Sequence, residues 1–188
     1  MIKVEQFMCR TDNFGALVHD PASGATAIID APEEAPIVAA VERTGWQPTQ
    51  LLGRHVSGCT VGIIGMGRIG KAIARRCHFG FGMQVLFHNR SVVSALDFPA
   101  RQVEGLDELL TQSDFAVVAV PGGAGTRHMI GTHELERLGP RSFIVNIARG
   151  DVVEEAALID ALRRGRIAGA GLDVYEFEPK VAPELCAL

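Results

Sequence analysis

The feature that most constrains this chain is a G-x-G-x-x-G motif at residues 65–70, set between a predicted strand and a predicted helix. The motif alone is weak evidence for nucleotide binding. Here it directly follows an apolar run at 60–64 and opens an amphipathic run at 68–79, which is the context that makes the motif informative. The first glycine permits a tight turn, the second lets a pyrophosphate approach the backbone, and the third lets helix and strand pack closely. The free N–H groups at the start of the helix would face the phosphates. The motif therefore predicts phosphate contacts from Gly65, Gly67, Arg68, Ile69 and Gly70, and the alternative is a glycine-rich turn that binds no ligand.

From residue 60 onward, short and continuously apolar segments alternate with amphipathic ones. This alternation is typical of a parallel sheet covered by helices on both faces. It predicts an α/β fold with a Rossmann-like, doubly wound parallel sheet. The expected strands are 60–64, 83–88, 114–120, 142–147 and 167–174, and the expected helices are 68–79, 106–112, 133–138 and 154–164.

The first 44 residues have a different pattern. Strands are expected at 2–7, 14–19 and 25–30, followed by a helix at 32–43, and Gly45-Trp46-Gln47-Pro48 breaks the helix. The sequence therefore predicts a small β-β-β-α segment at 1–44, followed by a dinucleotide-binding domain at 45–188.

Composition excludes several classes of protein. The 188 residues are 47% hydrophobic, which is enough for a real core, and a net charge of −4 argues against nucleic-acid binding driven by bulk charge. No apolar run reaches the roughly 18 residues that a membrane span needs, and the start of the chain shows no signal-peptide pattern. The four cysteines form no C-x-x-C pair, which argues against a zinc ribbon or a disulfide framework and favours a reducing, cytoplasmic setting.

The segment after the second predicted strand of the sheet bears on cofactor choice. An NAD site usually has an acidic residue about 20 residues after the glycines, where it binds the ribose hydroxyls. This chain has Asn89-Arg90-Ser91 there and no acid. An arginine with a hydroxyl neighbour suits a 2′-phosphate. The sequence therefore favours NADP, with NAD as the alternative, unless Arg90 merely points to solvent.

Four segments in order resemble the cofactor domain of D-2-hydroxyacid dehydrogenases. They are LLG at 51–53, VGIIGMGRIG at 61–70, VNIARG at 145–150 and GLDVYEFEP at 171–179. The resemblance runs from about residue 45 to 188 and is greatest to the glyoxylate/hydroxypyruvate reductase branch, partly because of Asn89-Arg90-Ser91. It implies an oxidoreductase that passes a hydride from a nicotinamide to a small 2-oxo acid.

The resemblance also implies roles for individual residues. Arg149 matches the catalytic arginine, which binds the substrate carboxylate and polarises the carbonyl, and Glu178 matches the glutamate that orients and charges a histidine acid. Asp173 matches the residue that binds the nicotinamide carboxamide. A surface ion pair between Arg149 and Glu178 is the alternative. Further cofactor contacts are implied for Val120, Pro121, Ile147 and Ala148.

Two departures from the family pattern affect activity. The family's histidine lies in a Pro-His-Leu-Gly-type motif that would fall after Leu188, and none of the six histidines of this chain sits in such a motif. The separate substrate domain has no counterpart either. We therefore expect weak turnover or none from this chain alone. A non-catalytic nucleotide-binding module or a truncated product is the rival interpretation, and a homodimer is the expectation carried over from the family.

Residues 1–44 resemble the start of a glyoxalase II-type hydroxyacylglutathione hydrolase of the metallo-β-lactamase fold. The resemblance rests on segments 2–7, 11–15, 19–24 and 29–32. The His-x-His-x-Asp-His motif that supplies metal ligands in that family is absent. The interpretation is a chimera with no metal site, in which hydrolysis is the least favoured function.

Overall fold

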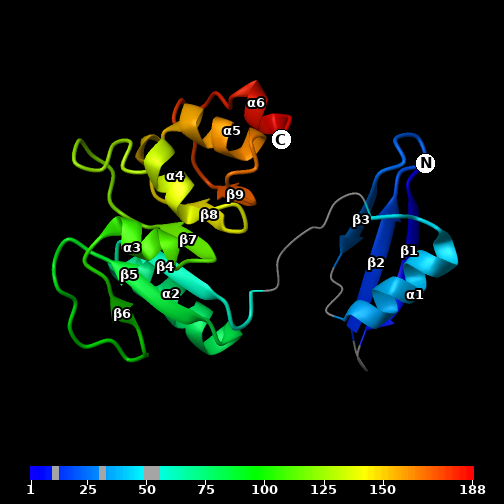
Figure 1. Cartoon of the computed structure of the whole chain (residues 1–188), viewed down its shortest axis with the longest axis horizontal. Helices are drawn as coiled ribbons and strands as arrows, with labels where there is room; N and C mark the ends of the chain where they lie inside the picture. The colour runs from blue at the N-terminus through cyan, green and yellow to red at the C-terminus, as the bar shows by residue number, and fades with distance from the viewer. Residues whose placement is uncertain (10–12, 30–32, 49–55) are drawn as a thin grey trace. The chain divides into compact units, whose positions relative to one another are not determined.

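The computed structural model describes residues 1–9, 13–29, 33–48 and 56–188, and the chain divides into two compact units. The first unit is Met1–His55 and the second is Val56–Leu188. Each unit is described by itself below (Figure 1). In the described part of the chain, no helix combines the length and apolarity needed to cross a lipid bilayer.

The first unit is a three-stranded antiparallel sheet with one helix. Its strands β1 (Lys3–Cys9), β2 (Asn13–His19) and β3 (Thr26–Ile29) pair in that order, and helix α1 (Glu34–Thr44) follows. The predicted β-β-β-α order is confirmed, although the predicted strand and helix ends at 30–32 lie outside the described residues. The helix packs on one face of the sheet, where the buried residues are Phe7, Cys9, Leu17 and Ala40.

Local chemistry explains where α1 ends and how it is held. Gly45 takes a left-handed conformation with φ of 71°, and its N–H donates to the carbonyl of Val41. This is the usual glycine stop of a helix. An ion pair of 2.6 Å between Arg43 of the helix and Glu5 of β1 adds a contact between helix and sheet.

The second unit contains a six-stranded sheet of order β6-β5-β4-β7-β8-β9, and every pairing in it is parallel. The chain starts in the centre of the sheet, runs to one edge, and then returns to continue on the other side of its first strand. This is the strand order of a doubly wound sheet. The predicted α/β fold with a Rossmann-like parallel sheet is therefore confirmed. The strands are β4 (Thr60–Ile64), β5 (Gln84–His88), β6 (Arg101–Gln102), β7 (Phe115–Val118), β8 (Phe143–Asn146) and β9 (Gly169–Leu172).

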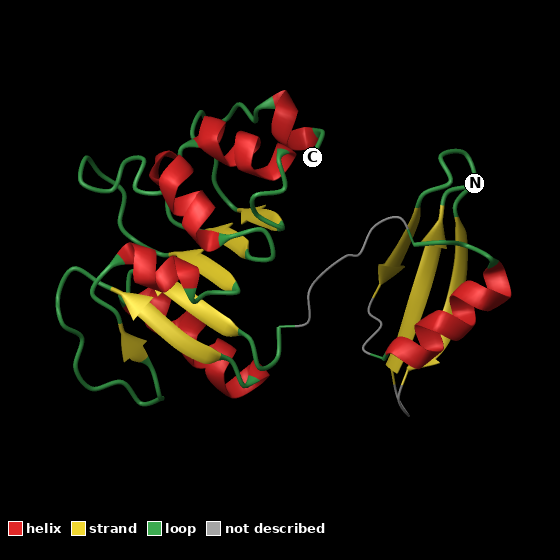
Figure 2. Ribbon diagram, in the orientation of Figure 1, coloured by secondary structure: helices red, strands yellow, loops and turns green. Residues whose placement is uncertain are grey.

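Helices cover both faces of this sheet (Figure 2). Neighbouring residues of β4 show the division, because successive side chains of a strand point to opposite faces. Ile63 packs in one cluster with Phe87 and with Ala74 of α2, whereas Ile64 packs in the other cluster with residues of α3, α4 and α5. The helices are α2 (Arg68–Phe81), α3 (Leu106–Thr111), α4 (Thr132–Leu138), α5 (Glu155–Arg163) and the short α6 (Pro183–Cys186), with a 3₁₀ turn η1 at Gly150–Val152.

The structure corrects several expected boundaries. Helix α2 runs two residues past the predicted end at 79, because it stops only at Gly82, whose φ is 62°. Strands β7 and β9 are shorter than the predicted 114–120 and 167–174, since the residues after Val118 and Leu172 leave the sheet as loops. The two-residue strand β6 and the helix α6 were not predicted, because elements this short carry no readable periodicity.

Candidate functional site

The turn after β4 requires glycine at two of its three motif positions. Gly65 has φ of 99°, and a Cβ on it would lie 2.8 Å from the carbonyl oxygen of Ala119. A Cβ on Gly70 would lie 2.1 Å from the carbonyl oxygen of Gly65, so only glycine lets α2 pack against the turn. A Cβ on Gly67 would meet no atom within 4 Å. The space in front of Gly67 is therefore open to a ligand.

The N-terminus of α2 has the features of an anion-binding site. The helix begins at Arg68, its N-cap is Gly67, and no side chain caps it. No acidic residue occupies its first turn. Helix N–H groups without a capping side chain, together with the positive end of the helix dipole, favour a phosphate at this position.

Two adjoining hollows extend from this helix end along the carboxyl ends of the central strands. The larger has a volume of about 730 Å³ and includes Arg68, Ile69, Ile147, Ala148 and Arg149. The smaller has a volume of about 480 Å³ and includes Gly65, Asn89, Arg90 and Ser91. Both are lined by Gly67, Ala119, Val120, Pro121, Gly122 and Gly123. The structure thus brings together all but three of the predicted site residues: Gly70 lies buried behind the turn, and Asp173 and Glu178 line neither hollow.

The loop after β5 is tied to the glycine turn through Asn89. Its Oδ1 accepts a hydrogen bond of 3.2 Å from the N–H of Met66, and its Nδ2 donates to the carbonyl and the hydroxyl of Ser91, at 2.9 and 3.2 Å. Arg90 between them is exposed and forms no hydrogen bond or ion pair with the residues that the structure describes. Its guanidinium is therefore available to an anion in the smaller hollow.

The turn after β8 places Arg149 at the larger hollow through a residue that the sequence patterns missed. Asn146 is 1% exposed; its Oδ1 accepts from the N–H of Ala148 at 3.1 Å and its Nδ2 donates to the carbonyl of Arg149 at 3.0 Å. The available signal was an asparagine closing an apolar strand, because such a buried amide needs partners. The Arg149 side chain is exposed, and its Nη1 donates to the Ala148 carbonyl at 2.7 Å.

The two predicted acidic residues after β9 lie outside the hollows. The Asp173 side chain is exposed, and its backbone N–H donates to the Asn146 carbonyl at 3.0 Å. The Glu178 carboxylate is also exposed and accepts a hydrogen bond of 3.0 Å from the N–H of Tyr175. Within the described residues, Arg149 and Glu178 do not form the surface ion pair weighed above.

A pair of residues far apart in sequence joins the loop after β7 to the loop after β9. Nε2 of His128 lies 2.6 Å from Oε1 of Glu176, and the other Glu176 oxygen accepts from the N–H of Glu155 at 3.1 Å. Burial raises the pKa of Glu176, but the hydrogen bonds from His128 and from the Glu155 amide outweigh it and hold the pKa below its ordinary value of 4.5. No local pattern predicts this pairing, because the two residues are 48 positions apart.

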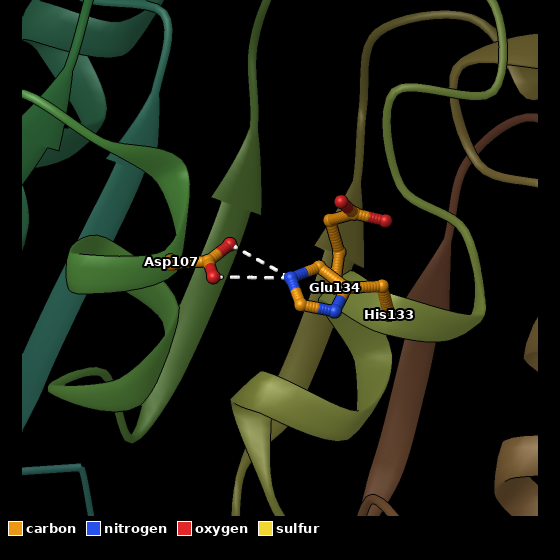
Figure 3. Close-up of side chains that lie close together, drawn as sticks. All are labelled: Asp107, His133 and Glu134. Atoms are coloured by element: carbon orange, nitrogen blue, oxygen red, sulfur yellow. Dashed lines mark hydrogen bonds and ion pairs between the residues drawn. The ribbon is translucent and has the colours of Figure 1, made fainter.

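A cluster of Asp107, His133 and Glu134 is accounted for by its protein contacts (Figure 3). Nε2 of His133 lies 3.0 Å from Asp107, and Arg137 approaches the same carboxylate at 3.6 Å. The Glu134 carboxylate accepts from the N–H of Gly131 at 3.0 Å, which caps α4. None of these residues lines either hollow. We therefore assign the cluster a structural role between α3 and α4.

The position of the hollows within the sheet indicates the class of protein. The strand order reverses between β4 and β7, and an open parallel sheet leaves its ligand crevice at that point, outside the carboxyl ends of the strands. The residues after both strands, Gly65 and Ala119, line the smaller hollow. Fold and site together define a Rossmann-type dinucleotide-binding domain.

Comparison with known families makes the assignment specific. Residues 32–188 match the family described as D-isomer specific 2-hydroxyacid dehydrogenase, NAD binding domain. The chain belongs to this family. The match begins earlier than the expected residue 45 and includes residues 32–44, which were expected to resemble a hydrolase. The resemblance of residues 1–44 to a glyoxalase II-type hydrolase therefore gains no support.

The similar proteins include reductases. The chain is 50% identical over 144 residues to a glyoxylate reductase of Thermococcus gammatolerans, covering 76% of this chain and 43% of the relative. A solved glyoxylate reductase from Paecilomyes thermophila has a TM-score of 0.70 and 42% identity over 80% of this chain and 46% of its own. An NADPH-dependent glyoxylate/hydroxypyruvate reductase from Sinorhizobium meliloti, solved with NADP and malonate, has a TM-score of 0.70 and 39% identity over 81% and 46%. The chain spans less than half the length of these relatives.

Proposed function

We propose that this chain binds NADP(H) across the two hollows and that the bound cofactor serves the reduction of a small 2-oxo acid. The observation that carries the proposal is Arg90, an unpaired guanidinium in the smaller hollow at the position where NAD sites usually place an acid. The NADP complex of the Sinorhizobium meliloti relative supports this choice. NAD is the alternative cofactor.

In this proposal, different residues bind different parts of the cofactor. The N-terminus of α2 and Gly67 hold the pyrophosphate, and the open space in front of Gly67 fits that group. Arg90 binds the 2′-phosphate, with Asn89 and Ser91 shaping its loop. Contacts with the rest of the cofactor come from the apolar residues that the central loops present, Val120, Pro121, Ile147 and Ala148.

The proposed chemistry centres on the larger hollow. When bound, the nicotinamide supplies the hydride. The Arg149 guanidinium at this hollow holds the carboxylate of a glyoxylate- or hydroxypyruvate-like substrate and polarises the adjacent carbonyl. Asp173 is proposed to bind the nicotinamide carboxamide, and Glu178 to charge a histidine acid. Neither side chain is among the residues that line the two hollows.

Among the residues that the structure describes, no histidine is placed to donate a proton at the larger hollow. Of the described histidines, none lines the larger hollow, and His88 at the smaller one bonds through Nδ1 to the carbonyl of Val103 at 3.3 Å. We therefore propose weak turnover or none for the chain alone, with cofactor binding intact. A non-catalytic nucleotide-binding module is the rival proposal.

Fluorescence titration with NADPH and NADH tests the binding proposal. Saturable binding that favours NADPH is the expected result. Equal affinity for both cofactors would contradict the role of Arg90, and binding of neither would contradict the cofactor site itself. Turnover of glyoxylate or hydroxypyruvate at the rate of a complete family member would contradict the proposal of weak activity.

Further proposals concern assembly and setting. A homodimer is proposed from family membership, and light scattering coupled to size-exclusion chromatography tests it. A reducing, cytoplasmic setting is supported by the cysteines, which are all free thiols, and localisation of a tagged chain tests it.

The origin of the first residues is a separate proposal. A chimeric origin of residues 1–44 stays a prediction from the sequence alone; residues 1–31 lie outside the family match, and β1–β3 form a sheet of their own. The sequence predicts a division between residues 44 and 45, whereas the two compact units of the structure divide after His55. The division at residue 44 stays a prediction. Thioesterase assay with a hydroxyacylglutathione tests whether any hydrolase function accompanies this segment, and no activity is expected.

A further inference from the structure

A single glutamine side chain holds the loop that carries Arg90. Gln102 lies on β6, the edge strand that pairs with Leu86 and Phe87 of β5. Its Nε2 donates to the carbonyl of Ser91 at 3.0 Å and to that of Asn89 at 3.4 Å. Its Oε1 accepts from the N–H of Val93 at 3.0 Å. One amide therefore satisfies three backbone groups of the segment 89–93.

These bonds continue into the glycine turn. Gln102 holds the carbonyls on either side of Arg90, and the Asn89 side chain within the same segment accepts from the N–H of Met66. The loop is thus fixed at both ends, by the edge strand and by the phosphate turn. Arg90, which has no side-chain bond of its own to the described residues, depends on this backbone for its position.

We propose that Gln102 is a positioning residue that sets the preference of the site for a 2′-phosphate. The inference rests on the proposed binding of NADP(H). A charged contact gains most when the loop that presents it is already ordered, because binding then loses less conformational freedom. Gln102 holds the backbone of the loop that carries Arg90. In this way it contributes, through Arg90, to the discrimination between NADP(H) and NAD(H).

Two substitutions separate the parts of this role. Gln102→Met keeps the length and the apolar stem of the side chain but removes the donor and the acceptor. Gln102→Glu keeps an acceptor for the Val93 N–H but replaces the donor with a carboxylate that faces the carbonyls of Asn89 and Ser91. Gln84→Met on β5 is the matched control, because Gln84 is exposed and lines neither hollow.

The experiment measures dissociation constants for 2′,5′-ADP and 5′-AMP by isothermal titration calorimetry, with NADPH and NADH as the full cofactors. The ratio of the two constants is the readout, because general destabilisation lowers both affinities together. For Gln102→Met we expect the preference for the 2′-phosphate to fall about tenfold, or about 1.4 kcal/mol, with 5′-AMP binding unchanged. Gln102→Glu should lose at least as much, and Gln84→Met should behave as the wild type. Circular dichroism confirms that each variant is folded.

The outcomes distinguish the inference from the function on which it rests. A wild-type chain without preference for 2′,5′-ADP overturns the proposed NADP site and the inference with it. A wild-type preference that Gln102→Met retains overturns the inference alone. Equal losses for both ligands, or the same loss in Gln84→Met, also overturn it, because they indicate a general effect on stability. If Gln102→Met does not fold, Gln102→Glu is judged by the same ratio.

Discussion

Alanine substitutions at two glycines of the same turn should separate stability from cofactor binding. At Gly65, alanine must adopt φ of 99° and place a Cβ 2.8 Å from the Ala119 carbonyl oxygen. The left-handed backbone costs about 1–2 kcal/mol and the overlap about 1–3 kcal/mol, so unfolding should become easier by roughly 2–5 kcal/mol. At Gly67, an extended N-cap with φ of −78°, an added Cβ meets no atom within 4 Å. The stability change there should stay within about 1 kcal/mol.

Among folded molecules, the loss of NADPH affinity should be larger for Gly67→Ala than for Gly65→Ala, the opposite of the order for stability. The Cβ of Gly67→Ala enters the open space proposed for the pyrophosphate, so NADPH affinity should fall at least about tenfold. Urea unfolding followed by far-UV circular dichroism measures stability, and NADPH fluorescence titration measures binding. Trp46, the chain's single tryptophan, lies in the first unit, so its fluorescence follows that unit separately and serves as an internal control.

Two results would refute this reasoning. If Gly65→Ala unfolds at the same urea concentration as the wild type, the turn does not require a left-handed residue in close contact with Ala119. If Gly67→Ala keeps wild-type affinity, the pyrophosphate does not approach the backbone at that glycine.

Three further predictions follow from the same structure. Arg90→Ser should weaken NADPH binding by roughly 10- to 100-fold, the value of one charged hydrogen-bonding contact, and leave NADH binding unchanged in parallel titrations; equal losses for both would contradict the assignment. Because the folded pKa of Glu176 is lowered, its stabilising contribution is present above its ordinary value of 4.5 and is lost as the pH falls through the folded value. In Glu176→Gln, the melting temperature should therefore fall less steeply with decreasing pH below about pH 4.5 than in the wild type. An unchanged dependence of the melting temperature on pH in this range would show that the contact with His128 carries no net stability. Asn146→Leu should lower stability by about 1–3 kcal/mol in urea unfolding, because it leaves the Ala148 N–H and the Arg149 carbonyl without their buried partner; a variant as stable as the wild type would show that water replaces the amide.

Much of the site could be predicted because its signals are local. The glycines of residues 65–70 encode a backbone turn, and the segment 89–91 follows a strand at a distance that the doubly wound fold determines. The structure places both segments at one hollow. The placement of Asp173 and Glu178 in the same site stays a prediction, because where a loop lies after its strand ends depends on what it packs against. In this structure Glu178 turns back to the N–H of Tyr175.

The sequence by itself determined which segments form strands and helices, and which functional residues lie at their ends. Apolar runs, amphipathic periods and glycines act within a few residues, so they can be read without knowing which strands are neighbours. Only the tertiary structure decided which ends meet: Gly65 against Ala119, Asn89 against Met66, Gln102 beneath Arg90, and His128 with Glu176. The physical reason is that these contacts depend on strand order and register, which bring together residues whose separation along the chain carries no periodic signal.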